Sequence, residues 1–231
     1  MIDSDAGEVS GEHDLRPNAV VLVVGTAIVG LVSALSLPWP IAIASTVLGT
    51  LMLAGADVDA RTFLLPDLTT LGAVVCGVVV APILDATAAW TAVSEAIARA
   101  GSVAVVLVLF RCSYARIRHR EGIGLGDVKL AGAIGAWLPL GAIPLCFGLA
   151  TSGALLVVMY ATFRGQSVTR TSRIPFGAFL CPALWIVFYM DRVTRQFEAE
   201  VRHARRFGDV SRGTRYRVGY NDDLLALPHE A

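Results

Sequence analysis

The chain has 231 residues, of which 55% are hydrophobic and 16% are charged, and its formal net charge is zero. Soluble domains average about 25% charged residues, so this balance indicates an integral membrane protein rather than a soluble one. A net charge of zero gives no general attraction to nucleic acid, and we expect no nucleic-acid partner.

The first residues are acidic. Five acidic side chains precede residue 18, against the single basic residue Arg16. A cleaved signal peptide needs a basic start and an early apolar core, and neither is present. We expect residues 1–17 to form a disordered acidic tail.

Seven apolar segments follow and predict an all-α fold, a polytopic bundle of membrane helices. They cover residues 19–37, 41–56, 68–84, 90–110, 125–138, 141–163 and 175–190. A helix needs about 20 residues to cross a bilayer, so 41–56 and 125–138 are short and 175–190 is marginal. We expect six or seven transmembrane helices in a membrane domain over residues 18–191, and a polar, arginine-rich tail over 192–231.

Two stretches of the chain combine a helical pattern with charged residues. Glu95 and Arg99 interrupt the fourth apolar segment, and their spacing of four residues allows an ion pair on one helix face. Beyond the seventh segment, residues 192–206 have the pattern of a polar surface helix.

Arginine is distributed unevenly over the connections between these segments. It is frequent between the fourth and fifth segments and after the sixth, but residues 85–89 carry none. The positive-inside rule places the arginine-rich connections in the cytoplasm. Arg61 then lies on the same side, because two spans separate it from Arg111. If residues 175–190 cross the membrane, the arginines of residues 192–206 lie outside, which violates the rule. Residues 175–190 therefore either cross the membrane or form a re-entrant segment, and the sequence leaves both alternatives open.

Two aspartates stand at the edges of apolar segments. Asp59 follows the second segment and Asp127 begins the fifth, and the predicted topology places both at the cytoplasmic edge. An ionisable group at membrane depth is costly and indicates a functional site. Two carboxylates that can meet favour hydrolysis by a pair sharing one proton.

Each aspartate also has a purely structural explanation. Asp127 follows Gly126 at a predicted helix start, where an aspartate is a common N-cap. Asp59 has competitors in Asp57 and Asp67, and any of the three could only solvate a turn.

Glycines and one lysine surround Asp127. Gly124 and Gly126 carry no side chain, so another backbone can approach closely, and Gly132 and Gly135 extend this small-residue pattern. Lys129 is the only lysine of the chain. It could snorkel towards the membrane interface, or its charge could tune the neighbouring carboxylates or meet a substrate carbonyl.

The cysteines and histidines do not suggest a metal site. The four cysteines are isolated, without a Cys-x-x-Cys pair, and no His-Glu-x-x-His sequence occurs. We expect small apolar packing roles for the cysteines, and no metal or other cofactor.

Three motifs together resemble the prepilin peptidases, the membrane aspartic proteases of the Gly-x-Gly-Asp group. The first is Asp59-x-Arg61 followed by Leu65-Pro66-Asp67-Leu68-Thr69, and the second is Gly124-Leu125-Gly126-Asp127-Val128-Lys129-Leu130. The third covers residues 174–180, with Ala178 where the family usually has proline. The resemblance runs from about Ile41 to Met190.

The resemblance implies a function and a site. The family's catalytic pair corresponds to Asp59 and Asp127, with Gly124, Gly126, Lys129, Arg61 and Asp67 in supporting positions. It implies cleavage of basic leader peptides from prepilin or pseudopilin substrates, in the inner membrane at its cytoplasmic face. Components of a pilus or secretion machinery are possible partners.

One feature departs from the full-length bacterial members. Those have a large loop after the first span, with two Cys-x-x-Cys pairs associated with N-methylation. Here only Pro38-Trp39-Pro40 joins the first two apolar segments. The chain resembles the short members of the family, and we do not predict methyltransferase activity.

Three other functions would need different residues or a different placement of the acidic side chains. A presenilin-like protease also uses Gly-Leu-Gly-Asp and has a tripeptide similar to Pro182-Ala183-Leu184, but its first aspartate follows a tyrosine. A rhomboid-like protease would need a membrane histidine to act with a serine such as Ser152, and the apolar segments contain no histidine.

A carrier would usually place its acidic residue in the middle of the bilayer, whereas Asp59 and Asp127 are predicted at one edge. A non-catalytic scaffold for pilus assembly, with both aspartates kept for packing, stays an alternative.

Overall fold

The structure is a computed structural model that describes residues 17–84, 88–118, 124–164 and 175–223, with side chains described as far as Arg205. The predicted acidic tail lies outside these ranges except for its last residue. All regular structure in the described residues is helical, which confirms the predicted all-α fold.

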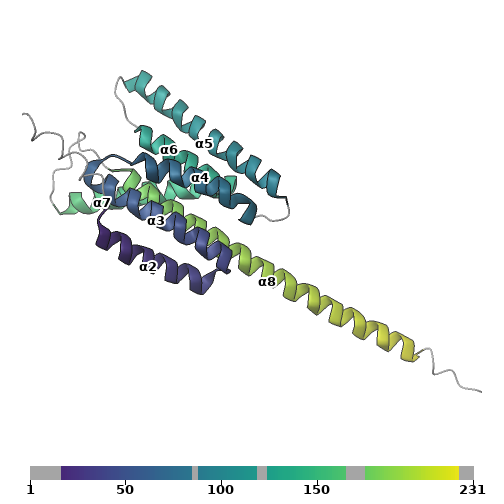
Figure 1. Cartoon of the computed structure of the whole chain (residues 1–231). Coiled ribbons are helices and arrows are strands. Elements are labelled where there is room, and N and C mark those ends of the chain that lie inside the picture. Colours follow the sequence, from purple (N-terminus) through teal and green to yellow (C-terminus); the bar gives the residue numbers. More distant parts are fainter. Residues whose placement is uncertain (1–16, 85–87, 119–123, 165–174, 224–231) are drawn as a thin grey trace, which may run out of the picture. The chain divides into compact units, whose positions relative to one another are not determined.

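Seven α-helices and one short 3-10 helix make up the described part of the chain (Figure 1). They are α2 (Ala19–Ser36), α3 (Trp39–Thr62), α4 (Asp67–Leu84), α5 (Ala89–Arg118), α6 (Leu125–Trp137), η1 (Leu140–Ala142), α7 (Ile143–Phe163) and α8 (Gly177–Asp223).

Five described segments are long and apolar enough to cross a membrane: α2, α3, α4, α5 and η1 with α7. Helix α6 has 13 residues, about 20 Å at 1.5 Å per residue, which is less than the roughly 30 Å of a bilayer core. Residues 175–190 contribute the start of α8. The predicted count of six or seven spans is therefore approximate.

Two predicted helix ends were too early. Helix α3 does not end at Ala56 but continues past both aspartates to Thr62, and α5 continues past Phe110 to Arg118. The α3 extension is possible because its acids are bonded: Asp57 accepts from Arg61 at 2.6 Å, and Asp59 accepts from the backbone of α8.

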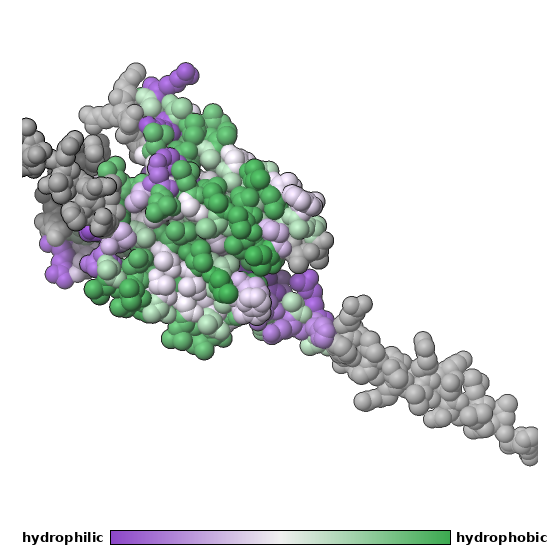
Figure 2. Space-filling model, viewed as in Figure 1, coloured by the Kyte–Doolittle hydropathy of each residue, from purple (hydrophilic) through white to green (hydrophobic). Residues whose placement is uncertain are grey.

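Large apolar side chains cover the outside of the bundle. Leu35, Trp39, Leu68, Trp90 and Phe163 are each more than three-quarters exposed, and Figure 2 shows hydrophobic residues over much of the visible face. A soluble monomer rarely exposes such large apolar areas. Contact with lipid explains this surface, in agreement with a membrane helix bundle.

Helix α6 lies inside the bundle. Every side chain from Leu130 to Leu138 is buried. The indole of Trp137 donates a hydrogen bond of 2.8 Å to the carbonyl oxygen of Ala73 in α4, and its ring meets Phe188 of α8 edge-on, with 5.2 Å between centroids. This packing fixes α6, the helix whose first turn contains Asp127.

Glycines allow neighbouring helices to approach α6. A Cβ at Gly135 would lie 2.5 Å from the carbonyl oxygen of Arg99 in α5, and one at Gly77 in α4 would lie 2.8 Å from the Cβ of Ala136. The predicted close approach is confirmed at Gly135. At Gly132 the nearest atom would be 3.6 Å away, an ordinary contact.

The chain divides into two compact units, the first ending at Met190 and the second beginning at Asp191. In the second unit, Arg195 donates a hydrogen bond of 2.8 Å to Asp191. Residues 192–206, predicted to form a polar helix, are part of α8. In α5 of the first unit, the predicted pair of Glu95 and Arg99 is confirmed, at 3.2 Å.

Candidate active site

Asp59 lies in the last turn of α3 with a buried side chain that is only 3% exposed. Its Oδ2 accepts a hydrogen bond of 2.7 Å from the backbone N–H of Ala178, and the backbone N–H of Gly177 also donates to this carboxylate. These groups begin α8, and the first N–H groups of a helix have no partner within it. A buried carboxylate needs such partners, and the helix N-terminus favours negative charge.

The end of α3 turns the chain back over Asp59. Phe63 adopts the left-handed conformation (φ 56°, ψ 24°), and its N–H bonds to the carbonyl oxygen of Asp59 at 2.9 Å. This conformation is uncommon for a residue other than glycine and commonly ends a helix. The chain then turns within three residues, and α4 begins at Asp67.

Asp127 lies in the first turn of α6 and is half-buried. The N-cap of this helix is Gly124, so the interpretation of Asp127 as the N-cap is wrong. Asp127 is instead the third helical residue, and its carboxylate accepts a hydrogen bond from the backbone of Gly124. This is one half of a capping box, in which the third residue bonds back to the N-cap N–H.

The two carboxylates come together at one end of the bundle. Their charges are near enough to interact with each other, and the buried thiol of Cys181 in α8 interacts with both. The site is therefore built from the end of α3, the start of α6 and the start of α8.

Leu65 packs between the glycines of two motifs. A Cβ at Gly126 would lie 3.0 Å from the Cβ of Leu65, and one at Gly177 would overlap Leu65 Cδ1 and lie 2.8 Å from Asp59 Oδ2. Glycine at position 177 therefore avoids an overlap with Leu65 and the Asp59 carboxylate, and glycine at position 126 avoids a tight contact with Leu65. A Cβ at Gly124 would make only an ordinary contact, 3.6 Å from Asp127 Oδ2.

The other charged residues near the site pair with each other. Asp57 bonds to Arg61 at 2.6 Å and accepts a hydrogen bond of 2.7 Å from the backbone N–H of Asn18. Asp67 pairs with Lys129, with 2.5 Å between Oδ1 and Nζ. Asp57 and Asp67, the two competitors of Asp59, are thus both engaged with cations.

Sequence reasoning assigned no role to three residues that contact the two aspartates or their glycines. Gly177 and Ala178 belong to the third motif, which was noticed only through the resemblance. Leu65 belongs to the first motif, where its apolar side chain gave no reason to choose it over Leu64. These three residues stand out from their neighbours only through contacts with distant parts of the chain, which the sequence does not show.

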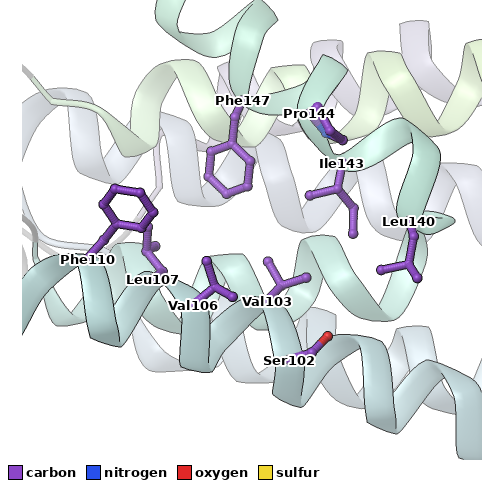
Figure 3. Close-up of a pocket in the computed structure, with 9 residues that line it drawn as sticks. All are labelled: Ser102, Val103, Val106, Leu107, Phe110, Leu140, Ile143, Pro144 and Phe147. Carbon is purple, nitrogen blue, oxygen red and sulfur yellow. The ribbon is translucent and has the colours of Figure 1, made fainter.

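A separate cavity of about 510 Å³ lies between α5 and the segment of η1 with α7. Figure 3 shows its side chains, which come from Ser102 to Phe110 on one side and Leu140 to Phe147 on the other. The lining is apolar except for Ser102, whose hydroxyl donates to the carbonyl oxygen of Arg99 at 2.9 Å. Neither carboxylate of the candidate pair lines this cavity.

Metal binding is a second role that acidic side chains can have. These residues contain no group of three or more histidine, cysteine, aspartate or glutamate side chains arranged to bind a metal ion. The chemistry that the described site offers is that of two carboxylates held by backbone N–H groups.

Comparison with known proteins gives a consistent set of relatives. A prepilin leader peptidase/N-methyltransferase of Xanthomonas campestris is 33% identical over 144 residues, covering 62% of this chain and 48% of that protein. Leader peptidase HopD of Escherichia coli is 34% identical over 130 residues, covering 56% of this chain and 81% of HopD. A prepilin leader peptidase/N-methyltransferase of Aeromonas salmonicida is 30% identical over 177 residues, covering 74% and 58%.

The chain spans about half the length of the prepilin leader peptidase/N-methyltransferases it matches, and no solved structure matches it. The model of the type IV leader peptidase family, Peptidase_A24, matches residues 46–163, half of the chain. That range contains both Asp59 and Asp127. The chain therefore belongs to the type IV leader peptidase family.

Proposed function

We propose that this chain is an aspartic-type endopeptidase that removes the leader peptide from a type IV or Flp-type prepilin or from a pseudopilin. Asp59 and Asp127 form its catalytic pair. The observation that carries the proposal is the shared surroundings of these two carboxylates: Leu65 packs against Gly126, next to Asp127, and against Gly177, whose neighbour Ala178 bonds to Asp59. The two carboxylates are also close enough to interact. Family membership supports the peptidase class, and the names of the relatives supply the substrate class.

The proposed reaction is hydrolysis without a covalent intermediate. Two neighbouring carboxylates do not both ionise easily, so the pair holds one proton. The ionised member takes a proton from a water molecule, whose oxygen attacks the scissile carbonyl carbon. The other member donates its proton to the carbonyl oxygen. The intermediate then collapses and the C–N bond breaks. The member that took the water proton gives it to the leaving nitrogen, and the other member takes the proton of a hydroxyl group as the new carboxyl group forms, so the pair again holds one proton.

The surroundings of the pair suit this reaction. The backbone N–H groups of Gly177 and Ala178 fix the Asp59 carboxylate, and Gly124 fixes that of Asp127. Positioned proton transfers of this kind typically each contribute 10²–10⁴-fold to a rate. Arg61 pairs with Asp57 at 2.6 Å, and Gly126 leaves room for Leu65.

The proposed location is the inner membrane, with the site on the cytoplasmic side. Helix α5 ends with Arg116 and Arg118, six residues before the N-cap of α6. The positive-inside rule favours the cytoplasm for this end of the bundle. A substrate with an apolar helix could then remain in the bilayer while its charged leader stays in the cytosol. We propose no cofactor and no methyltransferase activity.

The test is a leader-cleavage assay with the purified chain in detergent and a prepilin from the same genome. The wild-type chain should shorten the prepilin at one peptide bond, as determined by mass spectrometry. Asp59→Asn and Asp127→Asn should each abolish cleavage because either change removes one of the two proton-transfer groups. Both variants should remain inserted in the membrane.

The competing aspartates provide the controls. Asp57→Asn and Asp67→Asn should each retain measurable cleavage, since their carboxylates are engaged with Arg61 and Lys129. Cleavage by Asp59→Asn together with loss of cleavage in Asp57→Asn or Asp67→Asn would move the catalytic role to that residue. Intact prepilin with every variant, including wild type, would contradict the proposed function.

A further inference from the structure

The ion pair of Asp67 and Lys129 connects the two segments that carry the candidate catalytic residues. Asp67 is the first residue of α4, eight positions after Asp59, and Lys129 lies in α6, two positions after Asp127. The two partners are 62 residues apart in the chain, and their Oδ1 and Nζ atoms are 2.5 Å apart. By contrast, the Asp57–Arg61 and Glu95–Arg99 pairs each join residues four apart on one helix.

We propose that the Asp67–Lys129 ion pair is a positioning device that fixes the first turn of α6, and with it Asp127, relative to the segment that carries Asp59. This inference rests on the proposed peptidase function. Neither residue needs to contact the substrate. The pair acts by fixing the separation and orientation of the two catalytic carboxylates.

The packing at this end of the bundle leaves a role for such a device. Leu68 next to Asp67 is 82% exposed and Leu125 at the start of α6 is 63% exposed, so both side chains face away from the helices that surround the carboxylates. Gly124 and Gly126 contribute no side chains to hold the first turn of α6 in place. Burial of this helix becomes continuous only from Leu130 onwards. The deeper part of α6 is therefore fixed by its core, whereas the turn bearing Asp127 is only partly buried and is held by Leu65 against Gly126 and by Val128.

The backbones on both sides of the ion pair are well placed to transmit its effect. Val128 and Leu130, which flank Lys129, are buried, and so are Thr69 and Thr70 near Asp67. The hydroxyl of Thr69 donates to the carbonyl oxygen of Pro66 at 2.8 Å, which fixes the turn before α4. A bond between the two side chains thus restrains two ordered backbone segments.

The expected effect is on rate rather than on stability. The Asp67 side chain is 67% exposed and that of Lys129 35% exposed, and ion pairs this exposed contribute little to folding. Catalysis depends much more steeply on geometry, since a misplacement of about 1 Å can lower a rate about 10²-fold. Loss of the pair should therefore lower kcat without unfolding the protein.

The experiment is a double-mutant cycle in the leader-cleavage assay. Asp67→Asn and Lys129→Met should each lower kcat about 10- to 100-fold with KM unchanged. The double variant should be no slower than the slower single variant, because each change already removes the same restraint. Lys129→Arg keeps the charge and a donor, and it should restore kcat to within about threefold of wild type.

A control variant tests for general effects of removing an ion pair. Glu95→Gln removes the exposed partner of Arg99, and both residues of this ion pair lie in α5. The change does not remove the separate hydrogen bond of 3.4 Å from Arg99 Nε to the carbonyl oxygen of Gly135 in α6. It should leave kcat within about twofold of wild type. The unfolding temperatures of all these variants should stay close to that of wild type, so that a change in kcat reports positioning and not loss of fold.

Several results would overturn the inference while leaving the proposed function intact. Losses that multiply in the double variant would mean that the residues act independently. A normal rate in Asp67→Asn with a slow Lys129→Met, or a raised KM, would mean that Lys129 acts on the substrate without Asp67. A wild-type chain that does not cleave, or an Asp127→Asn variant that does, would instead refute the proposed function and the inference with it.

Discussion

The backbone N–H of Ala178 donates a hydrogen bond of 2.7 Å to Oδ2 of Asp59, a residue 119 positions earlier in the chain. This contact joins the third motif to the first. It explains why a buried carboxylate is tolerated at the end of α3, and it gives one of the first N–H groups of α8 a partner. The match to the family model ends at residue 163, so this partner of Asp59 lies outside it.

Gly177→Ala should abolish or strongly reduce leader cleavage. The added Cβ would lie 2.8 Å from Asp59 Oδ2 and would overlap Leu65, so the carboxylate or the start of α8 must shift. A shift of about 1 Å can cost about 10²-fold in rate. Gly148→Ala in α7 is the matched control, because a Cβ there meets no atom within 4 Å. Equal activity of the two variants, measured as initial cleavage rates, would contradict the packing described at Gly177.

The two glycines of the second motif should differ in their sensitivity to substitution. Gly126→Ala places a Cβ 3.0 Å from that of Leu65, whereas Gly124→Ala places one 3.6 Å from Asp127 Oδ2. We therefore expect Gly126→Ala to lose more activity than Gly124→Ala, and the cleavage rates of both can be compared in one assay. The reverse order would mean that the conformation of Gly124, rather than contact with Leu65, limits the site.

Gly135→Ala should destabilise the bundle. Its Cβ would lie 2.5 Å from the carbonyl oxygen of Arg99, so α5 and α6 must separate. Overpacking in a well-packed core typically costs about 1–3 kcal/mol in the free energy of unfolding. Thermal unfolding in detergent should show a lower midpoint than wild type. Gly101→Ala in α5, which meets nothing within 4 Å, should not. Equal midpoints would contradict the close crossing of α5 and α6.

The orientation of α5 can be tested by labelling. In a Cys112→Ser background, Arg118→Cys at the end of α5 should react with a membrane-impermeant maleimide only from the cytoplasmic side. Thr91→Cys at its start should react only from the opposite side, because the positive-inside rule places the arginine-rich end in the cytoplasm. Both positions are exposed. The opposite labelling pattern would place the carboxylate pair on the outer side of the membrane.

Much of the helical fold follows from the apolar segments. The boundaries of α2 and α4 agree with the predicted spans to within one residue, because lipid-facing helices are apolar over their whole length. The prediction ended α3 too early because aspartates normally mark the end of an apolar span. The Asp59 carboxylate is buried and bonds to the start of α8, and a pattern of neighbouring residues does not contain that information.

The sequence predicts part of the candidate site. The arginine pattern and the spans predict that Asp59 and Asp127 share the cytoplasmic edge of the membrane, which stays a prediction. In the structure the end of α3 and the start of α6 meet through Leu65 and Gly126. The sequence does not show that Gly124 rather than Asp127 is the N-cap of α6, because glycine and aspartate are both common at that position. The pairing of Lys129 with Asp67 and the packing of Leu65 depend on how α4 and α6 meet, which the sequence alone does not specify.

The most direct test of the central claim is the single-turnover rate of leader cleavage by wild type, Asp59→Asn, Asp127→Asn and the double variant. Residues that act as one unit have strongly non-additive effects. We predict that each single variant loses essentially all activity and that the double variant is no slower than either. Substantial activity in one single variant, with a further large loss in the double, would show that the two carboxylates do not work as a pair.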